Sequence, residues 1–509
     1  MKFLKLFAVF ATLTMLLNML AVFPVSAASA AATLQVSNAG TSSPQTGDFT
    51  PSGSGDQTLA EFPGQLDGDN GPGPYPGTIV NRSLSPDTSN GVSVNSGKKA
   101  KSNPQFNTGF EGLNLFQQRY ARGGNQFTVE PPDQGLCVGN GYVLEAVNDV
   151  INIFNGSGQS VLPDNTATNI VAGFPTDVNH AVDLNSFFGY APAINRSTAV
   201  RGQFVTDPSC LYDSATQRFF VVVLTLETLS NGSFTGQNHL DLAVSSTSDP
   251  TGAWNIYRVP VQNDGTDGTP DHGCPLNNDG TGHGACLGDY PHIGADAYGF
   301  YITTNEYAFF PGSVYMGAQI YAFSKTALAS GAASIAISQF DTRHSGVGGH
   351  PGFTVWPAQS PASNQFNLNA GGTEYFLSSD AAAEAQCDSG AVCFQGAGTS
   401  NHLLVWSLTN TSSLNTATPS LNLSNKVLTV VQYAIHPGCN NLALGRHQPP
   451  LCHRGSASMT QPPLPLPGLA AGSFCSPTRP PSTRSSQGQT QMTPACSRSC
   501  IPMASCGVP

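Results

Sequence analysis

From Pro131 onward, the chain is a succession of short apolar and aromatic runs separated by turn residues, and this rhythm limits the folds open to it. The runs are too short for helices that bury a core, and Gly, Asn, Asp and Pro interrupt them at close intervals. In the clearest example, the turn Asn148-Asp149 separates the runs 142–147 and 150–154. Such a pattern predicts antiparallel strands joined by tight turns.

Similar units recur along the chain, in the segments 210–224, 240–259, 292–323, 374–408 and 426–433. A sheet of four antiparallel strands gives this rhythm when it forms the blade of a propeller, because each blade buries both faces against its neighbours. We therefore predict an all-β fold with few helices, a β-propeller whose blades lie within residues 106–435. A two-sheet sandwich is the structural alternative.

Several of these units carry polar motifs. They are Pro131-Pro132-Asp133-Gln134-Gly135 with Val138-Gly139-Asn140, Asp207-Pro208 ahead of Leu211-Tyr212-Asp213, Ser246-Thr247-Ser248-Asp249-Pro250-Thr251-Gly252, and Asp289-Tyr290-Pro291-His292-Ile293-Gly294. Together they cover about residues 131–330, and in this order they resemble a group of secreted bacterial β-propeller proteins of unknown function that is distantly sialidase-like. The resemblance implies a propeller fold and little about activity, because one fold hosts many functions.

The N-terminus has the features of a secretory signal peptide. Lys2 and Lys5 precede an apolar run over residues 6–23, and Val25-Ser26-Ala27 supplies the small residues that signal peptidase requires. We predict cleavage after Ala27, a secreted protein, and no membrane span after cleavage. A membrane anchor is the alternative, but the run is short and no charged stop-transfer segment follows it.

Residues 28–105 are rich in Gly, Ser, Thr, Asn and Pro and hold few large apolar groups. Such a stretch buries too little surface to offset the entropy of ordering the chain. We predict a flexible low-complexity leader.

In an exported chain the 12 cysteines are expected to form disulfides. Cys274 with Cys286 and Cys387 with Cys393 would each close a short loop. Cys137 and Cys210 occupy matching places in the early strands of successive units, so we predict that they form a third disulfide.

From His436 to residue 509 the strand rhythm stops, and Pro, Ser, Arg and six cysteines dominate. A disulfide-knotted module is one interpretation. A frameshift in the gene near residues 436–440 is the interpretation we favour, because the codons from Met492, read from the third base of the Met codon, permit Asp-Thr-Arg-Met-Gln-Gln-Val-Val-Tyr-Ser-Asn-Gly-Lys-Leu-Trp-Gly. That product is two strands around an Asn-Gly turn, and it resembles the continuation found in the same group. The predicted tail is therefore irregular and the propeller incomplete.

Charge excludes one class of partner. A net charge of −11, from 20 Lys plus Arg against 31 Asp plus Glu, comes with no basic stripe to meet phosphates, so nucleic acid is not an expected partner.

The loop 264–289 is the most polar of the predicted domain, and its carboxylates alternate with glycine. Hard oxygen ligands on such a loop suit Ca²⁺, although the spacing matches no EF-hand, and a solvated loop is the alternative. The candidate ligands are Asp264, Asp267, Asp271 and Asp279. His272, His283 and His292 lie nearby, but they share no spacing typical of a zinc site.

No catalytic motif is recognisable: the chain has no Gly-x-Ser-x-Gly, no His-Glu-x-x-His and no phosphate-binding glycine loop. We predict an extracellular binding or interaction module that meets a protein or a glycan through the loops at one mouth of the propeller, and not an enzyme. A sialidase-like or other glycan-active hydrolase is the alternative. It requires arginines that converge on a carboxylate, from the set Arg119, Arg122, Arg196, Arg201 and Arg343.

Overall fold

The computed structural model describes residues 31–46, 109–114, 117–118, 121–127, 129, 133–163, 180–277, 282–310, 314–343, 349–360, 362–382, 384–386 and 399–434. The predicted signal peptide and the tail lie outside these residues, so both stay predictions. Within them, no helix has the length and apolarity that a membrane crossing needs.

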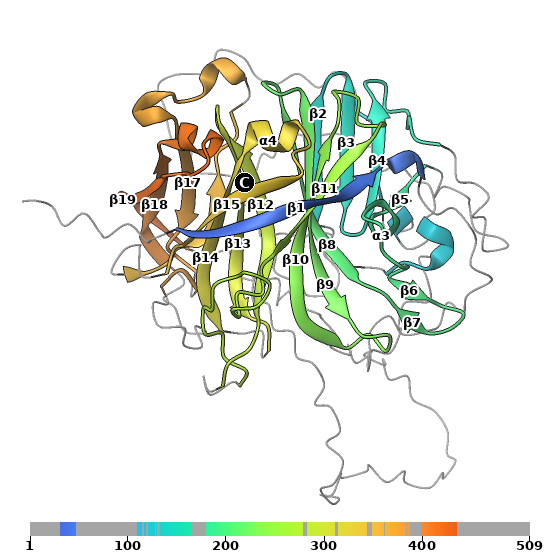
Figure 1. Ribbon diagram of the computed structural model, residues 1–509, viewed down its shortest axis with the longest axis horizontal. Coiled ribbons are helices and arrows are strands. Elements are labelled where there is room, and N and C mark those ends of the chain that lie inside the picture. The colour runs from blue at the N-terminus through green and yellow to red at the C-terminus, as the bar shows by residue number, and fades with distance from the viewer. Residues whose placement is uncertain are drawn as a thin grey trace, which may run out of the picture.

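Four groups of four consecutive antiparallel strands follow one another along the chain, and we call them the first to fourth meanders. Figure 1 shows them in order from the cyan strands on the right to the orange strands on the left. The first consists of β2 (Gln134–Gly139), β3 (Tyr142–Val147), β4 (Val150–Asn155) and β5 (Val182–Asp183), and the second of β8 (Phe204–Asp213), β9 (Arg218–Thr228), β10 (Phe234–Ser245) and β11 (Trp254–Pro260). The third consists of β12 (Cys286–Ala295), β13 (Gly299–Ala308), β14 (Tyr315–Ser324) and β15 (Ser334–Asp341), and the fourth of β16 (Phe353–Pro357), β17 (Thr373–Ser379), β18 (Thr399–Thr409) and β19 (Asn422–Ala434).

The remaining regular elements are short. A two-stranded sheet pairs β6 (Ile194–Asn195) with β7 (Val200–Arg201), and the helices α3 (Leu184–Phe187) and α4 (Lys325–Ala329) are one turn each. The structure is therefore mostly β with few helices, as the turn-rich sequence predicts. The predicted hairpin at Asn148-Asp149 is confirmed, because Val147 pairs directly with Val150.

The meanders pack face to face through apolar side chains. Between the second and third, the rings of Phe220 and Phe300 stack with centroids 4.5 Å apart. Between the third and fourth, Tyr301 meets Phe376 edge-on at 5.8 Å. Because each fully buried large side chain stabilises the fold by about 1.5–3 kcal/mol, these interfaces hold the sheets together more than any single hydrogen bond does.

The first strands of the meanders contact one another in chain order: β2 contacts β8, β8 contacts β12, and β12 contacts β16. A disulfide between Cys137 on β2 and Cys210 on β8 links the first two. Successive four-stranded sheets with touching first strands are the arrangement that a propeller requires.

The prediction of a flexible leader is wrong for residues 32–42, which form the strand β1 (Ala32–Ser42). This strand pairs with β11 on one side and β15 on the other, so it joins the second and third meanders into one nine-stranded sheet. It crosses the front of the molecule in blue in Figure 1. Leu34 and Val36 are 3% and 4% exposed. Two apolar residues in alternation are enough here, because two existing sheet edges satisfy the backbone of β1 on both sides.

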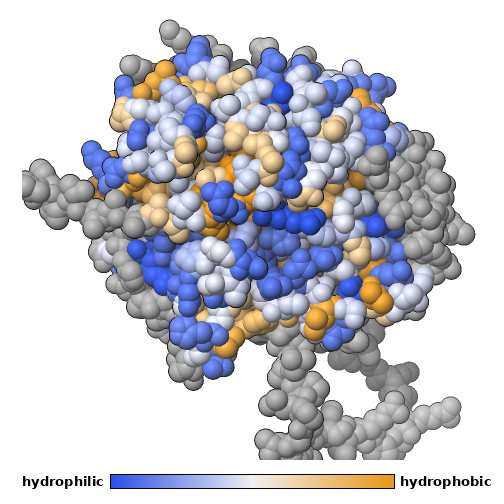
Figure 2. Space-filling view, viewed as in Figure 1, coloured by the Kyte–Doolittle hydropathy of each residue, from blue (hydrophilic) through white to orange (hydrophobic). Residues whose placement is uncertain are grey.

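On the face that β1 crosses, hydrophobic and hydrophilic residues are interspersed, and the hydrophobic ones form small separate groups (Figure 2). The rest of the predicted leader, residues 47–105, lies outside the described part of the chain.

Candidate active site

Three buried aspartates lie where the first strands of the first three meanders meet. Asp133 directly precedes β2, Asp207 lies in β8 and Asp289 lies in β12. Their side chains belong to residues that are 4%, 1% and 3% exposed. The contacts of β8 with both β2 and β12 bring these three positions together.

Backbone irregularities at equivalent places aim two of these carboxylates. The pairing of β8 with β9 shifts between Thr206 and Ser209, and Asp207 has a φ of +53°. In β12 the register shifts between Asp289 and His292, and Tyr290 has a φ of +51°. A proline follows in each case, at the bulge, where a strand tolerates the loss of a ladder hydrogen bond. Such bulges redirect a side chain out of the regular alternation of a strand.

Asp133 is held by a different device, an exchange with the β3–β4 turn. Its backbone N–H donates to Asn148 Oδ1 at 3.0 Å, and its carbonyl accepts from the N–H of Asn148 at 2.8 Å. The turn that the sequence predicts at Asn148-Asp149 therefore also fixes the residue that begins the inner strand.

The pKa values of all three carboxyl groups are raised. Burial raises the pKa of Asp133 to about 10, with further contributions from the neighbouring Asp207 and Asp289. Burial also raises the pKa of Asp207 to about 6, where hydrogen bonds from Asp133 and Thr206 act in the opposite direction. The pKa of Asp289 lies well above its usual value because of burial and the charge of Asp207. At neutral pH the cluster thus combines a neutral acid, Asp133, with an ionised carboxylate, Asp207.

Each of these three aspartates has one oxygen, Oδ2, that accepts no hydrogen bond within the described residues. His292 adds a fourth buried group of this kind, its Nε2. Burial lowers the pKa of His292 to about 3, so the ring is neutral. Buried polar atoms without partners are uncommon, and they mark a place where a ligand or solvent completes the hydrogen bonding.

Aromatic rings flank the cluster. The ring of Trp356 stacks on His292 with centroids 3.8 Å apart, and Tyr290 meets His292 edge-on at 4.3 Å. Trp356 and Tyr290 are both half-buried, so each presents part of its ring to solvent.

Sequence reasoning did not single out these aspartates as functional, although they belong to the motifs that carry the family resemblance. The signal available was positional: an aspartate stands at or just before the first strand of three successive units, and in two of them a proline follows closely.

The predicted calcium ligands lie elsewhere and serve separate turns. Asp264 Oδ1 accepts from Thr266, Asp267 Oδ2 accepts from Gln262 Nε2 at 2.8 Å, and Asp271 Oδ1 accepts from the N–H of Gly273. Asp279 lies outside the described residues. Within the described residues, no group of three His, Cys, Asp or Glu side chains is arranged to hold a metal ion.

The predicted disulfide between Cys274 and Cys286 is present and closes this loop. Cys387 and Cys393 lie outside the described residues. The histidines of this region have different surroundings: His272 Nδ1 is 2.9 Å from Glu306 Oε2, whereas His292 lies against Trp356.

The arginines of the sialidase alternative have separate partners. Arg122 pairs with Asp183 at 3.3 Å, whereas Arg343 lies 3.6 Å from Glu306 and 3.7 Å from Asp341. The guanidinium groups of Arg196 and Arg201 donate to the backbone carbonyls of Gly124 and Ala199. Arg119 lies outside the described residues. These contacts do not form the shared carboxylate-binding group that the alternative requires.

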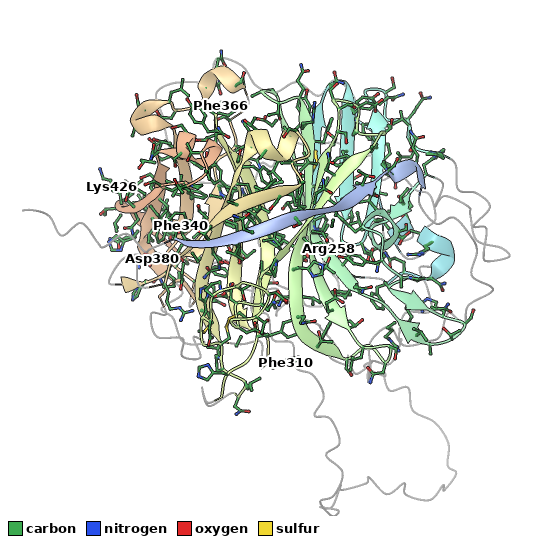
Figure 3. The ribbon with its side chains drawn as sticks, viewed as in Figure 1. Arg258, Phe310, Phe340, Phe366, Asp380 and Lys426 are labelled. Atoms are coloured by element: carbon green, nitrogen blue, oxygen red, sulfur yellow. A yellow bond between two sulfur atoms is a disulfide. The ribbon has the colours of Figure 1, made fainter. Side chains whose placement is uncertain are left out.

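A tyrosine–carboxylate pair does occur, but its chemistry is unsuited to nucleophilic attack. Tyr190 Oη donates to Asp241 Oδ2 at 2.8 Å, and Arg258, labelled in Figure 3, lies 4.6 Å from the centre of the Tyr190 ring. Arg258 Nε also donates to Asp241 at 3.2 Å. Burial and the Asp241 charge raise the pKa of Tyr190, so the phenol stays protonated. This cluster ties β10 and β11 to the segment after α3.

Scans against protein-family models and curated proteins gave no match. Three solved structures show a distant likeness. An exo-β-1,3-galactanase from Clostridium thermocellum has a TM-score of 0.24 and 12% identity, over 60% of this chain and 50% of its own. The GH43_1 enzyme from Xanthomonas citri complexed with xylotriose has a TM-score of 0.21 and 11% identity, over 58% and 87%. The WD40 domain of SCAP from fission yeast has a TM-score of 0.12 and 8% identity, over 57% and 74%.

This chain therefore spans about half the length of the first of these structures. Likeness at this level assigns neither a family nor an activity, and the sialidase-like character that the motifs imply stays a prediction.

Proposed function

We propose that this protein is a secreted β-propeller enzyme that hydrolyses glycosidic bonds with Asp133, Asp207 and Asp289 as its reactive group. The observation that carries the proposal is the meeting of three buried carboxyl groups, each with an unpartnered oxygen, at the first strands of three successive meanders. Two disulfides among the described residues fit an oxidising compartment outside the cytoplasm.

The environments of the three carboxyl groups shift their pKa values by different amounts, and glycoside hydrolysis requires a protonated and an ionised carboxyl group together. Asp289, with a pKa well above its usual value, is the proton donor to the leaving-group oxygen. Asp207, with a pKa of about 6, is ionised at neutral pH and activates the attacking group. Asp133 is protonated and donates a hydrogen bond to Asp207, which keeps that carboxylate ionised and oriented.

Two features favour a sugar substrate. The half-buried rings of Trp356 and Tyr290 lie beside the cluster, and aromatic faces are the usual stacking surfaces for pyranose rings. His292 is neutral because its pKa is about 3. It therefore adds a hydrogen-bonding group to the site without adding a charge.

The test is hydrolysis of a panel of xylan, arabinan, galactan and sialylated glycans by the full chain after removal of the signal peptide, measured as new reducing ends. We expect activity on one of them and a loss of about 100-fold or more in Asp207→Asn and Asp289→Asn. Asp289→Asn should recover on aryl glycosides whose leaving group needs no proton. Asp264→Asn is the matched control, because this aspartate is only half-buried and accepts from the N–H of Thr266 in a separate turn, and it should keep full activity.

A binding module is the second candidate, and the near-complete burial of the three aspartates is the observation that favours it. Retardation of the chain in affinity electrophoresis on one polysaccharide, with no reducing ends released from any of them, would support binding and overturn hydrolysis. Full activity in Asp207→Asn would overturn the assignment of the site.

A further inference from the structure

The two meanders at the ends of the series each leave apolar residues exposed on one face, whereas the inner two are covered on both. Every residue of β13 and β14 is buried, as expected for a sheet packed on both faces. In β17, by contrast, buried and exposed residues alternate, and Tyr375 and Leu377 are 42% and 46% exposed. At the other end of the series the exposure is confined to β2, because residues before it cover the rest of that face: the N–H of Leu113 donates to Glu145 on β3, and the ring of Phe110 lies 5.1 Å from that of Phe154 on β4.

The uncovered face of the fourth meander extends across three strands. Leu377 is paired with Val405, and Leu403 is paired with Leu428. Cross-strand partners lie on one face of a sheet, so these side chains form a continuous apolar surface. The opposite face, which includes Phe376 and Trp406, packs against the third meander.

The edge strand of this meander is the most exposed strand of the series. In β19, Leu428 is 38% exposed and Val431 is 89% exposed. Lys426, on the same strand, lies at the outer end of the molecule in Figure 3.

The exposed apolar residues of the first meander are on β2. Leu136 and Val138 are 53% and 65% exposed, whereas Cys137 between them is buried and bonded to Cys210 of the second meander. One face of β2 therefore meets β8, and the alternate residues have no neighbouring sheet among the described residues.

We propose that one further four-stranded meander occupies the place between the fourth and first meanders, and that the gene encodes it after residue 434 in a reading frame other than that of the printed tail. A single sheet placed there covers both apolar faces, because in a ring of sheets the last lies next to the first.

The genetic code supports the shifted frame. Cysteine codons begin with TG, so a frame that starts on the third base of the preceding codon reads NTG, which is Leu, Met or Val whatever the first base. All six cysteines of the printed tail, Cys439, Cys452, Cys475, Cys496, Cys500 and Cys506, therefore become apolar residues. The concentration of cysteine after residue 436 is thus explained as apolar strand residues read in the wrong frame.

One further residue of this frame is also forced, and its neighbour is limited to four choices. The pair Met503-Ala504 gives GGC, a glycine, and Pro502-Met503 gives NAT, which is Asn, Asp, His or Tyr. The pairs ending in Cys500 and Cys506 place an apolar residue on each side of this dipeptide. An apolar residue, a turn of the Asn-Gly or Asp-Gly kind and a second apolar residue are the signature of a β-hairpin, which is the unit of every meander in this chain.

The test compares two full-length chains, the printed one and one continued in the third-base frame from codon 436. Single cysteines replace Val138, Leu377 and, as a control, Leu229, which is 54% exposed on a turn of the second meander. Maleimide labelling of each site is followed by peptide mass spectrometry, which separates these sites from the native cysteines.

We expect Val138→Cys and Leu377→Cys to react rapidly in the printed chain and at least tenfold more slowly in the reframed chain. Leu229→Cys should react equally in both. Resequencing of the gene over codons 430–509 should show the base that restores the second frame.

Equal labelling of all three sites in both chains would overturn the proposal. So would slow labelling of Val138→Cys and Leu377→Cys in the printed chain, since the printed tail or a second copy of the chain would then cover the faces. Sedimentation of the printed chain distinguishes those two occupants, because only a second copy makes the protection depend on concentration.

Discussion

The carboxyl groups of Asp133 and Asp207 lie close enough for each to shift the pKa of the other, although the two residues belong to different sheets. The disulfide between Cys137 and Cys210 joins the same two strands a few residues further along. The relative position of these two carboxyl groups is therefore held by a covalent link as well as by packing.

Asp133 is expected to cost stability. A carboxyl group with a raised pKa keeps its proton in the folded chain at a pH where the unfolded chain has released it, so it destabilises the fold above the unfolded pKa of 3.8. Asp133→Asn removes this penalty, and we expect it to raise the free energy of unfolding at pH 7 by about 1–3 kcal/mol, the typical cost of a buried unpaired polar group. Urea unfolding at pH 7 measures the change. At pH 3, where both states of the wild type are protonated, the difference should nearly vanish; an equal gain at both pH values would contradict this account.

His272 is expected to stabilise the fold at acidic pH. Burial lowers the pKa of its ring, but the Glu306 carboxylate outweighs burial and raises it above 6.5. The stabilisation is fully present below pH 6.5 and is lost as the pH rises through the higher pKa of the folded state. In His272→Gln, the fall in unfolding free energy between pH 6 and pH 8 should shrink by about 1 kcal/mol. Urea titrations at the two pH values give the result, and His283→Gln is the comparison variant.

A buried ion pair supports the junction of the second and third meanders. Lys325 Nζ lies 3.0 Å from Asp213 Oδ1, and both side chains are almost fully buried. Lys325→Met leaves the Asp213 charge without its partner and should lower the free energy of unfolding by about 3–5 kcal/mol. The double variant Lys325→Met with Asp213→Asn should recover much of that loss. Chemical denaturation of the wild type, the two single variants and the double variant gives the four free energies of unfolding. Strictly additive losses would show that the pair is not coupled.

The N-terminal strand is expected to matter for stability although it lies far from the other strands in sequence. Val36→Ala removes two methyl groups from a side chain that is 4% exposed, so we expect a loss of about 1–2 kcal/mol. Gln35→Ala, on the exposed face of the same strand, should change stability by less than about 0.5 kcal/mol. The thermal unfolding midpoint of each variant provides the measurement. Wild-type stability in Val36→Ala would mean that β1 adds little to the fold.

The strands that could be predicted from sequence are those whose signal is local. The hairpin at Asn148-Asp149 and the pair 240–245 and 254–259 combine apolar runs with turn residues, and both are present. The strand β1 could not be predicted, because its stability comes from the two strands that receive it and not from its own composition.

The candidate site, like β1, has no local signal in the sequence. Asp133, Asp207 and Asp289 are separated by long stretches of sequence, and only the packing of β2, β8 and β12 brings them together. The polar loop at Asp264 was predicted to bind Ca²⁺ because its carboxylates are close in sequence. In the structure each of the described carboxylates accepts hydrogen bonds within its own turn. Proximity in sequence is a poor guide to a site built from separate sheets.

The position of β1 also sets an order of events for folding. Ser334 on β15 meets Gln35 on β1 across a separation of 299 residues, and Asn38 on the same strand is paired with Tyr257. The two edges that receive β1 are both present only when the chain has been extended through residue 341. The first strand in the chain therefore gains both of its neighbours only after the second and third meanders have formed.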